Sequence, residues 1–152
     1  MESEATTMST QHIPEGYSTL TAYYRIKNVQ QYLHFLELAF EAETLESYPG
    51  KDGSIMHAEV RIGDSRLMMG EACDERGPTH CMQYMYVPDV DAAFEHVLKA
   101  GAESIQDPAD QFYGHRTCGL RDPFGNEWWL ANKQETMDPE EIARRSKESA
   151  AQ

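Results

Sequence analysis

The sequence predicts an α+β fold made of two tandem βαβββ units, followed by a short C-terminal helix. Three observations support it. The chain resembles itself at an offset of about 61 positions, each copy opens with a strand-like run followed by a helical pattern, and three further strand-like runs complete each copy. One domain of this kind suits a chain of 152 residues.

The internal repeat has an offset of 61 positions. Tyr23 aligns with Tyr84, and Val29 aligns with Val90. The two copies cover about residues 19–70 and 82–131, and the residues between them form a linker that contains Gly and Pro.

Each copy contains one amphipathic helix that begins after a capping residue. Asn28 precedes the first helix and Asp89 the second, and Gly101 lies where the second helix should end. Apolar residues recur at steps of three and four in both, at Val29, Tyr32, Leu33, Leu36 and Phe40, and at Val90, Ala93, Phe94, Val97 and Leu98.

Extended runs rich in aromatic and β-branched residues predict the strands. Gly63-Asp64 predicts a hairpin in the first copy, and the segment 122–126 predicts a turn in the second. The expected strands are 19–26, 43–48, 56–62 and 66–70, and then 82–87, 103–106, 116–121 and 127–131.

The two ends lie outside the repeats. Residues 1–16 are polar and are expected to form a flexible lead without a signal peptide, which favours a cytoplasmic protein. The expected domain spans residues 17–133. In the tail, 134–152, Asp138-Pro139 followed by two glutamates predicts the start of a helix.

Composition excludes several classes of function. The chain has 13 Lys and Arg and 26 Asp and Glu, which gives a net charge of −13. Such a charge disfavours binding to nucleic acid. No apolar run is long enough to span a membrane. Three cysteines without a C-x-x-C spacing predict neither a disulfide framework nor a zinc knuckle.

Four short motifs, in order, carry a family resemblance. With the repeat, they make residues 19–133 resemble the vicinal-oxygen-chelate (glyoxalase/bleomycin-resistance/dioxygenase) superfamily, in particular its PhnB-like branch. The resemblance implies a curved mixed sheet that encloses a cup, helices outside, a homodimer, and in many members a divalent metal ion in the cup. The motifs occupy residues 57–65, 86–91, 112–116 and 121–126.

The resemblance places the four metal-ligand positions at Thr21, Met68, Met82 and Trp129. Divalent ions prefer imidazole, carboxylate or thiolate ligands, and none of these four residues supplies one. We therefore expect no metal and no other cofactor. The alternative is a divalent metal held at shifted positions, by His80, Glu127 and Glu71.

Strand alternation predicts which side chains face the cup. His57 and Glu59 would act there as general acid or base. Alternation, together with the loop at 112–116 that the resemblance places at the mouth of the cup, predicts the ligand-binding residues Tyr23, Arg25, Arg61, Arg66, Met68, Met82, Tyr84, Tyr86, His115 and Trp129.

Three functions follow from the resemblance and from this predicted cup. The preferred one is the binding of a small organic molecule without a metal ion. The second is a metal-dependent lyase, isomerase or dioxygenase with shifted ligands, and the third is a metal-free acid–base enzyme that uses His57 and Glu59. The fold does not choose among them.

Overall fold

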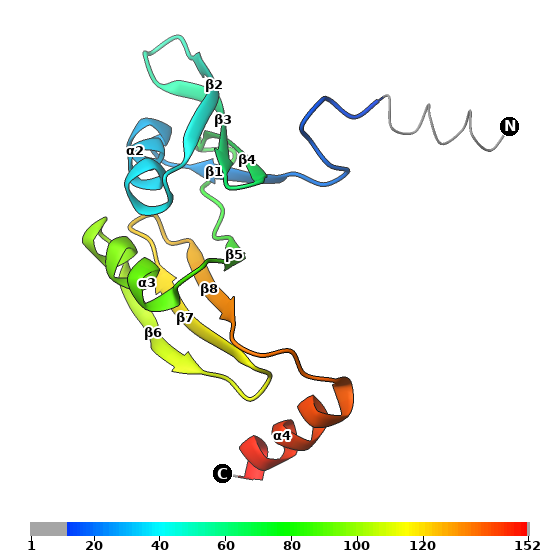
Figure 1. Ribbon diagram of the computed structural model, residues 1–152. Coiled ribbons are helices and arrows are strands. Elements are labelled where there is room, and N and C mark those ends of the chain that lie inside the picture. The colour runs from blue at the N-terminus through cyan, green and yellow to red at the C-terminus, as the bar shows by residue number, and fades with distance from the viewer. Residues whose placement is uncertain (1–11, 152) are drawn as a thin grey trace, which may run out of the picture. The chain divides into compact units, whose positions relative to one another are not determined.

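The computed structural model describes residues 12–151, and it has the predicted α+β fold (Figure 1). The described chain divides into two compact units, one with residues up to Leu33 and Glu41–Pro78, the other with His34–Phe40 and the chain from Thr79 onward. Residues 1–11 of the predicted flexible lead lie outside the described residues.

The elements follow the order β-α-β-β-β twice. The first set is β1 (Ala22–Ile26), α2 (Val29–Phe40), β2 (Glu43–Pro49), β3 (Ile55–Ile62) and β4 (Ser65–Glu71). The second set is β5 (Met82–Tyr86), α3 (Val90–Lys99), β6 (Glu103–Asp110), β7 (His115–Arg121) and β8 (Glu127–Lys133), and helix α4 (Pro139–Ala151) follows.

Both sheets have the same mixed topology. The strand orders are β1-β4-β3-β2 and β5-β8-β7-β6, with the first strand of each unit parallel to its last strand and the other pairs antiparallel. The two registers also correspond, since Tyr23 pairs with Met68 and Tyr84 with Trp129. The repeat predicted from the sequence is therefore a repeat of structure.

Strand β6 is longer than predicted, because the sequence favoured an end at Gln106. It runs through Pro108 to Asp110, with irregular pairing to β7 after Ser104 and again after Gln106. A proline is tolerated there because β6 is an edge strand, where one missing backbone N–H costs no ladder hydrogen bond.

Burial alternates along the strands as predicted. In the first unit the buried residues include Tyr24, Ile26, Val60 and Met69, and the Tyr24 ring lies 6.2 Å from the ring of Tyr32 on α2. The opposite faces of the same strands carry the polar and aromatic residues predicted for ligand binding.

In the second unit, α3 packs against one face of the sheet (Figure 1). The buried residues include Trp128 and Leu130 on β8, Leu120 on β7, and Val90 and Val97 on the helix. This apolar layer holds the sheet in place and leaves its other face for the candidate site.

The last strand of each unit caps the helix of that unit. The Glu71 carboxylate accepts hydrogen bonds from the backbone N–H groups of Asn28 (2.7 Å) and Val29 (3.1 Å), and Asn132 Oδ1 accepts one from Val90 (3.0 Å). Positions 71 and 132 are again 61 apart, so the cap belongs to the repeat. A carboxylate at a helix N-terminus also interacts favourably with the helix dipole.

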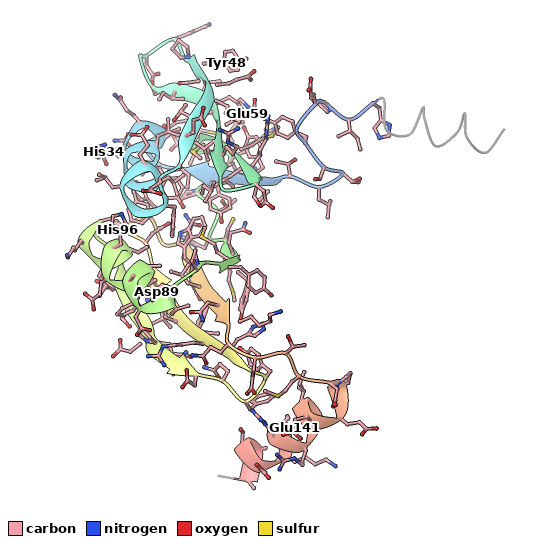
Figure 2. All side chains as sticks on the ribbon, viewed as in Figure 1. His34, Tyr48, Glu59, Asp89, His96 and Glu141 are labelled. Carbon is pink, nitrogen blue, oxygen red and sulfur yellow. The ribbon has the colours of Figure 1, made fainter. Side chains whose placement is uncertain are left out.

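Local capping also follows the prediction. Asn28 accepts a hydrogen bond from the backbone of Gln31, and Asp89, which Figure 2 labels at the start of α3, accepts one from Ala92. Gly101, at φ 118°, ends α3 in the left-handed conformation that favours glycine.

The turn between β7 and β8 is built around the carboxylate of Asp122, which is 3% exposed. One of its oxygens accepts the backbone N–H groups of Phe124 (2.8 Å) and Asn126 (3.0 Å), and the other accepts the indole N–H of Trp128 (3.0 Å). The Asn126 side chain in turn accepts the N–H of Cys81 at the start of β5 (2.8 Å). The predicted turn therefore ties two strands of the second sheet together.

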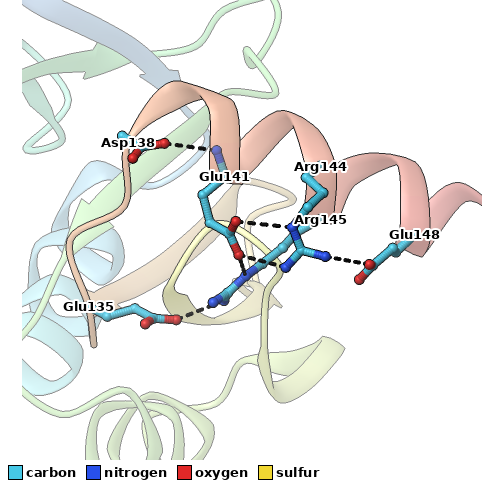
Figure 3. Close-up of polar contacts among 6 residues, drawn as sticks. All are labelled: Glu135, Asp138, Glu141, Arg144, Arg145 and Glu148. Atoms are coloured by element: carbon cyan, nitrogen blue, oxygen red, sulfur yellow. Dashed lines mark hydrogen bonds and ion pairs between the residues drawn. The ribbon is translucent and has the colours of Figure 1, made fainter.

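Helix α4 is held by a network of surface ion pairs (Figure 3). Asp138 accepts the N–H of Glu141 at the helix start, and Glu141 pairs with both Arg144 and Arg145 at 2.7 and 2.8 Å. Arg145 also pairs with Glu135 at 2.8 Å, which joins the helix to the segment before it. None of the residues of α4 is buried, so these pairs and the cap hold the helix.

We expect helix α4 to loosen in acid. Hydrogen bonds from Arg144 and Arg145 lower the pKa of Glu141 from 4.5 to about 2. A depressed folded-state pKa means that the stabilisation is present above about pH 4.5 and is lost as the pH falls toward 2. Helical circular dichroism between pH 5 and 2 measures the change, and Glu141→Gln should weaken the helix at neutral pH and flatten the profile. Identical profiles for the two proteins would contradict it.

Among residues 12–151, no helix is long and apolar enough to cross a membrane.

Candidate functional site

The open face of the first sheet carries a chain of hydrogen bonds between three predicted site residues. The Tyr23 hydroxyl lies 3.1 Å from His57 Nδ1, and His57 Nε2 lies 3.2 Å from Glu59 Oε2. Tyr23 is on β1, whereas His57 and Glu59 are on β3, two residues apart and thus on one face. The strands therefore bring a phenol, an imidazole and a carboxylate together, as strand alternation predicted.

A glycine makes the contact between Tyr23 and His57 possible. Strand β4 lies between β1 and β3, and Gly70 on β4 pairs with His57. A Cβ atom on Gly70 would lie 2.6 Å from the Tyr23 hydroxyl oxygen and 2.9 Å from the backbone oxygen of Met56. The hydroxyl group of Tyr23 thus occupies the space that any other residue would fill.

A residue that the sequence did not single out completes this arrangement. Tyr17 donates a hydrogen bond to Glu59 Oε1, so each oxygen of this carboxylate has a donor. Tyr17 is held by a turn in which its N–H bonds to the carbonyl of Pro14 (3.0 Å) and Gly16 has φ 87°. The turn signal Pro-Glu-Gly was available in the sequence, but the length of chain between Tyr17 and β3 concealed the contact.

Each of the three arginines predicted for ligand binding has a partner of its own. Arg66 lies over the Tyr17 ring, 4.6 Å from its centroid, which is a cation–π contact. Arg61 pairs with Glu43 on β2, and Arg25 donates to the carbonyl of Gly77 (3.3 Å). Arg66 is thus joined through Tyr17 to the Tyr23–His57–Glu59 chain.

The open face of the second sheet carries a cluster of aromatic rings. Tyr84 and Tyr86 on β5 lie 5.5 Å apart between centroids, and Tyr86 lies 6.1 Å from His115 on β7. Tyr113, in the loop before β7, lies 5.2 Å from His115. Partial burial and a hydrogen bond with Tyr113 raise the pKa of Tyr84 above its ordinary value.

His115 adds a polar atom to this aromatic cluster. Its Nδ1 is buried, and within the described residues it has no hydrogen-bond partner. An unpaired buried polar atom costs free energy. Two rings of the cluster are open to solvent, because Tyr84 is 44% and Tyr86 69% exposed.

Trp129 forms the floor of the same face. Its indole N–H donates to Glu127 Oε1 (3.0 Å), and its ring covers Gly119, where a Cβ atom would lie 2.7 Å from ring carbons. Nearby on β7, Thr117 accepts hydrogen bonds from the side chains of Gln106 (3.2 Å) and Gln111 (3.0 Å). The face is therefore aromatic with a polar margin.

The loop that carries Tyr113 is tied to the segment before α4. The carbonyl of Gly114 accepts hydrogen bonds from the N–H groups of Gln134 (2.8 Å) and Glu135 (3.1 Å). Gly114 has φ 86°, and a Cβ atom there would lie 2.8 Å from the carbonyl oxygen of Glu135. The tail thus supports the aromatic cluster, a role that the sequence did not reveal.

Cys118 is expected to resist thiol reagents in the folded protein. It is fully buried next to Leu120 and Leu130, and burial raises the pKa of its thiol to about 11. At neutral pH this leaves roughly 100-fold less thiolate than an ordinary cysteine has. Labelling with a disulfide reagent should modify the exposed Cys73 first, and Cys118 only after unfolding. The variant Cys73→Ser removes the fast phase, and a fast phase that persists at Cys118 would contradict this expectation.

The family model for the Glyoxalase/Bleomycin resistance protein/Dioxygenase superfamily matches residues 19–130. The chain belongs to this superfamily. A Mycobacterium bovis protein of uncharacterized function, Mb0911c, is 31% identical over 121 residues, which cover 72% of this chain and 80% of that protein. The Mycobacterium tuberculosis protein Rv0887c is similar at 31% identity, over 72% of this chain and 71% of its own length.

Solved structures of the superfamily share the fold. TioX from Micromonospora sp. ML1 superposes with a TM-score of 0.66 at 24% identity, over 77% of this chain and 99% of TioX. A glyoxalase/bleomycin resistance protein/dioxygenase from Nocardioides gives 0.61 at 14% identity, over 90% and 97% of the two chains. A PhnB protein from Bacillus cereus gives 0.62 at 12% identity, over 76% and 99%.

The positions at which this superfamily resemblance places metal ligands do not fit a divalent ion. They hold Thr21, Met68, Met82 and Trp129, of which Trp129 is engaged with Glu127 and Met82 is 59% exposed. Thioethers suit only soft metals, and an indole does not ligate. Over residues 12–151, no three His, Cys, Asp or Glu side chains are grouped so as to hold a metal.

The residues of the shifted set have structural partners. Glu71 caps helix α2, and Glu127 accepts the indole N–H of Trp129. His80 packs on the turn at Gly125, where a Cβ atom would lie 2.9 Å from its ring. A metal at these residues would have to compete with each of these contacts.

Proposed function

We propose that this superfamily member binds a small planar organic molecule on the aromatic face of the second sheet, and that it needs no metal ion to do so. The observation that carries the proposal is the group of exposed rings beside an unpartnered buried nitrogen, at Tyr84, Tyr86 and His115. Aromatic side chains with a few polar groups are typical of sites for flat, largely apolar ligands.

The charge of the protein favours a cationic ligand. The net charge of −13 attracts cations at long range and repels anions. Within the face, Glu127 lies beside Trp129 and supplies a local negative group. Bleomycin, which the superfamily name mentions, combines planar aromatic rings with a positive tail and is therefore a suitable first probe.

Calorimetric titration with metal-free bleomycin in the presence of a chelator tests the proposal. The planar cation ethidium and the planar anion anilinonaphthalene sulfonate serve as a matched pair that differs in charge. We expect saturable binding of bleomycin or ethidium, and weaker binding of the anion. No binding of any probe, or binding that appears only when zinc is added, would count against a metal-free site.

Two variants locate the binding. Replacement of Tyr84 or Tyr86 by Ala should weaken it about fivefold or more, because the loss of one stacked ring costs roughly 1–3 kcal/mol. Tyr48→Ala is the matched control, since Tyr48 is 52% exposed but lies on β2 of the first unit. An equal loss in all three variants would contradict the assignment to the second sheet.

We further propose that the protein is a homodimer, as the family resemblance implies, and that it is cytoplasmic. Three cysteines that form no disulfide suit a reducing compartment. Strand β5 lies at the edge of its sheet, where unpaired backbone groups suit pairing with another chain. Light scattering at micromolar concentration should give twice the chain mass of 17.3 kDa, and a monomer mass would overturn the proposal.

A further inference from the structure

Tyr17 joins the segment that leads into β1 to the open face of the first sheet. We call this segment, residues 12–20, the strap. Its side chains are exposed except for the half-buried Ile13 and Tyr17, and Leu20 is 89% exposed. The Tyr17 hydroxyl donates to Glu59 Oε1 on β3, a residue that is 7% exposed and that Figure 2 labels on the first sheet. A segment with so little buried apolar surface opens locally at a low cost in free energy.

The strap is shaped to hold its tyrosine against Arg66 on β4. The Arg66 guanidinium lies 4.6 Å from the centroid of the Tyr17 ring. The preceding residue, Gly16, has φ 87°, and a Cβ atom there would lie 2.6 Å from the guanidinium carbon. The Tyr17 N–H also closes a turn onto the carbonyl of Pro14 (3.0 Å). The backbone of the strap therefore lies against the arginine at a distance that only glycine allows.

Release of the strap would leave two groups of opposite charge on the open face. Glu59 Oε2 would keep its contact with His57 Nε2 at 3.2 Å, whereas Oε1 would lose the donor from Tyr17. A carboxylate oxygen only accepts hydrogen bonds, and one that is shielded from water is costly to leave without a donor. The Arg66 guanidinium would lose the ring with which it makes a cation–π contact. An aromatic ring that carries a hydroxyl group complements both groups, and this is the chemistry that Tyr17 supplies.

We propose that the strap is an autoinhibitory lid, and that Tyr17 occupies a binding site for phenolic compounds. A phenolic ligand takes the place of Tyr17, donates a hydrogen bond to Glu59 Oε1 and lays its ring against Arg66. The strap must leave before the ligand enters, so the free energy that holds the strap down is subtracted from the affinity of the ligand. This site lies in the first unit, and it adds a second ligand and a means of control to the function proposed above.

The small phenol p-cresol tests the proposal, because it reproduces the side chain of Tyr17. Titration of the full chain, followed by nuclear magnetic resonance, measures its affinity. Tyr17→Ala should bind p-cresol about tenfold or more tighter than the wild type, since no competing phenol remains on the protein. Toluene, which lacks the hydroxyl, should show no such gain, and circular dichroism checks that the variant is folded. Equal affinities of the two proteins for p-cresol, or an equal gain for toluene, would overturn the proposal.

A pair of arginine variants locates the site. In the Tyr17→Ala background, Arg66→Ala should abolish the gain in affinity for p-cresol. Arg61→Ala is the matched control, because Arg61 lies opposite Arg66 in the register of β3 and β4 but pairs with Glu43. This control should keep the gain, and a gain that is lost in both variants, or in neither, contradicts the placement at Arg66. Tyr84→Ala should also keep the gain, which separates failure here from failure of the aromatic site.

Hydrogen exchange measured by mass spectrometry tests whether the strap moves. Saturating p-cresol should speed exchange in the wild-type peptide that contains the strap, because the turn that holds the Tyr17 N–H opens when the ring is displaced. Exchange in the peptide of helix α4 should stay unchanged, and toluene at the same concentration should have no effect on either peptide. If the strap exchanges at the same rate or more slowly with p-cresol bound, Tyr17 does not block the site and the proposal is wrong.

Discussion

Replacement of Asp122 by Ala is expected to lower the free energy of unfolding by about 2–4 kcal/mol. The loss leaves three donors without their acceptor in a buried turn, namely two backbone N–H groups and the indole N–H of Trp128. Trp128 itself is 2% exposed, so water cannot replace the carboxylate there. The turn also positions Asn126, whose side chain holds the start of β5.

Urea denaturation followed by tryptophan fluorescence measures this loss. Asp52→Ala is a matched control, because Asp52 also accepts two hydrogen bonds in a turn, from Ser54, but is exposed. It should cost less than about 1 kcal/mol, since water takes over the bonds that it loses. Equal costs for the two variants would show that burial of the Asp122 network does not matter for stability.

Replacement of Gly70 by Ala is expected to destabilise the first unit by about 1–3 kcal/mol and to separate Tyr23 from His57. The added methyl group would lie 2.6 Å from the Tyr23 oxygen and 2.9 Å from a backbone oxygen, so the phenol is the group that must move. Urea denaturation measures the loss of stability.

A double-mutant cycle tests whether the strain comes from the contact between the added methyl group and the Tyr23 hydroxyl. In Tyr23→Phe the hydroxyl is absent, and the nearest ring carbon of residue 23 lies 3.4 Å from the added methyl group. Gly70→Ala should therefore cost less in the Tyr23→Phe background than in the wild type. If the cost is the same in both, the strain comes from the backbone of Met56 and not from the phenol.

Much of the fold was predictable because its signals are local. Asn28 and Asp89 cap their helices from the adjacent position, and Gly101 adopts the backbone conformation that ends a helix. Because the two copies are offset by about 61 positions, each element predicted in the first copy also indicated the corresponding element in the second. The end of β6 was missed because Pro108 argues against a strand, and only its place at the edge of the sheet makes it acceptable.

The candidate sites were predictable only in part. Alternation placed Tyr23, His57 and Glu59 on one face, because a strand has a period of two. It did not reveal that Gly70 lets the Tyr23 hydroxyl reach His57, or that Tyr17 reaches Glu59 from a turn far away in the sequence. Such contacts depend on which strands are neighbours, and local patterns do not encode that pairing.

The helix caps supplied by Glu71 and Asn132 have a consequence for the order of folding. Each cap joins residues 42 positions apart in the chain, Val29 with Glu71 and Val90 with Asn132. Contacts of such sequence separation form late, because a long loop must close before they contribute. During synthesis, helix α2 should therefore remain frayed at its start until the last strand of its unit leaves the ribosome, and each half of the protein should become stable only in that final step.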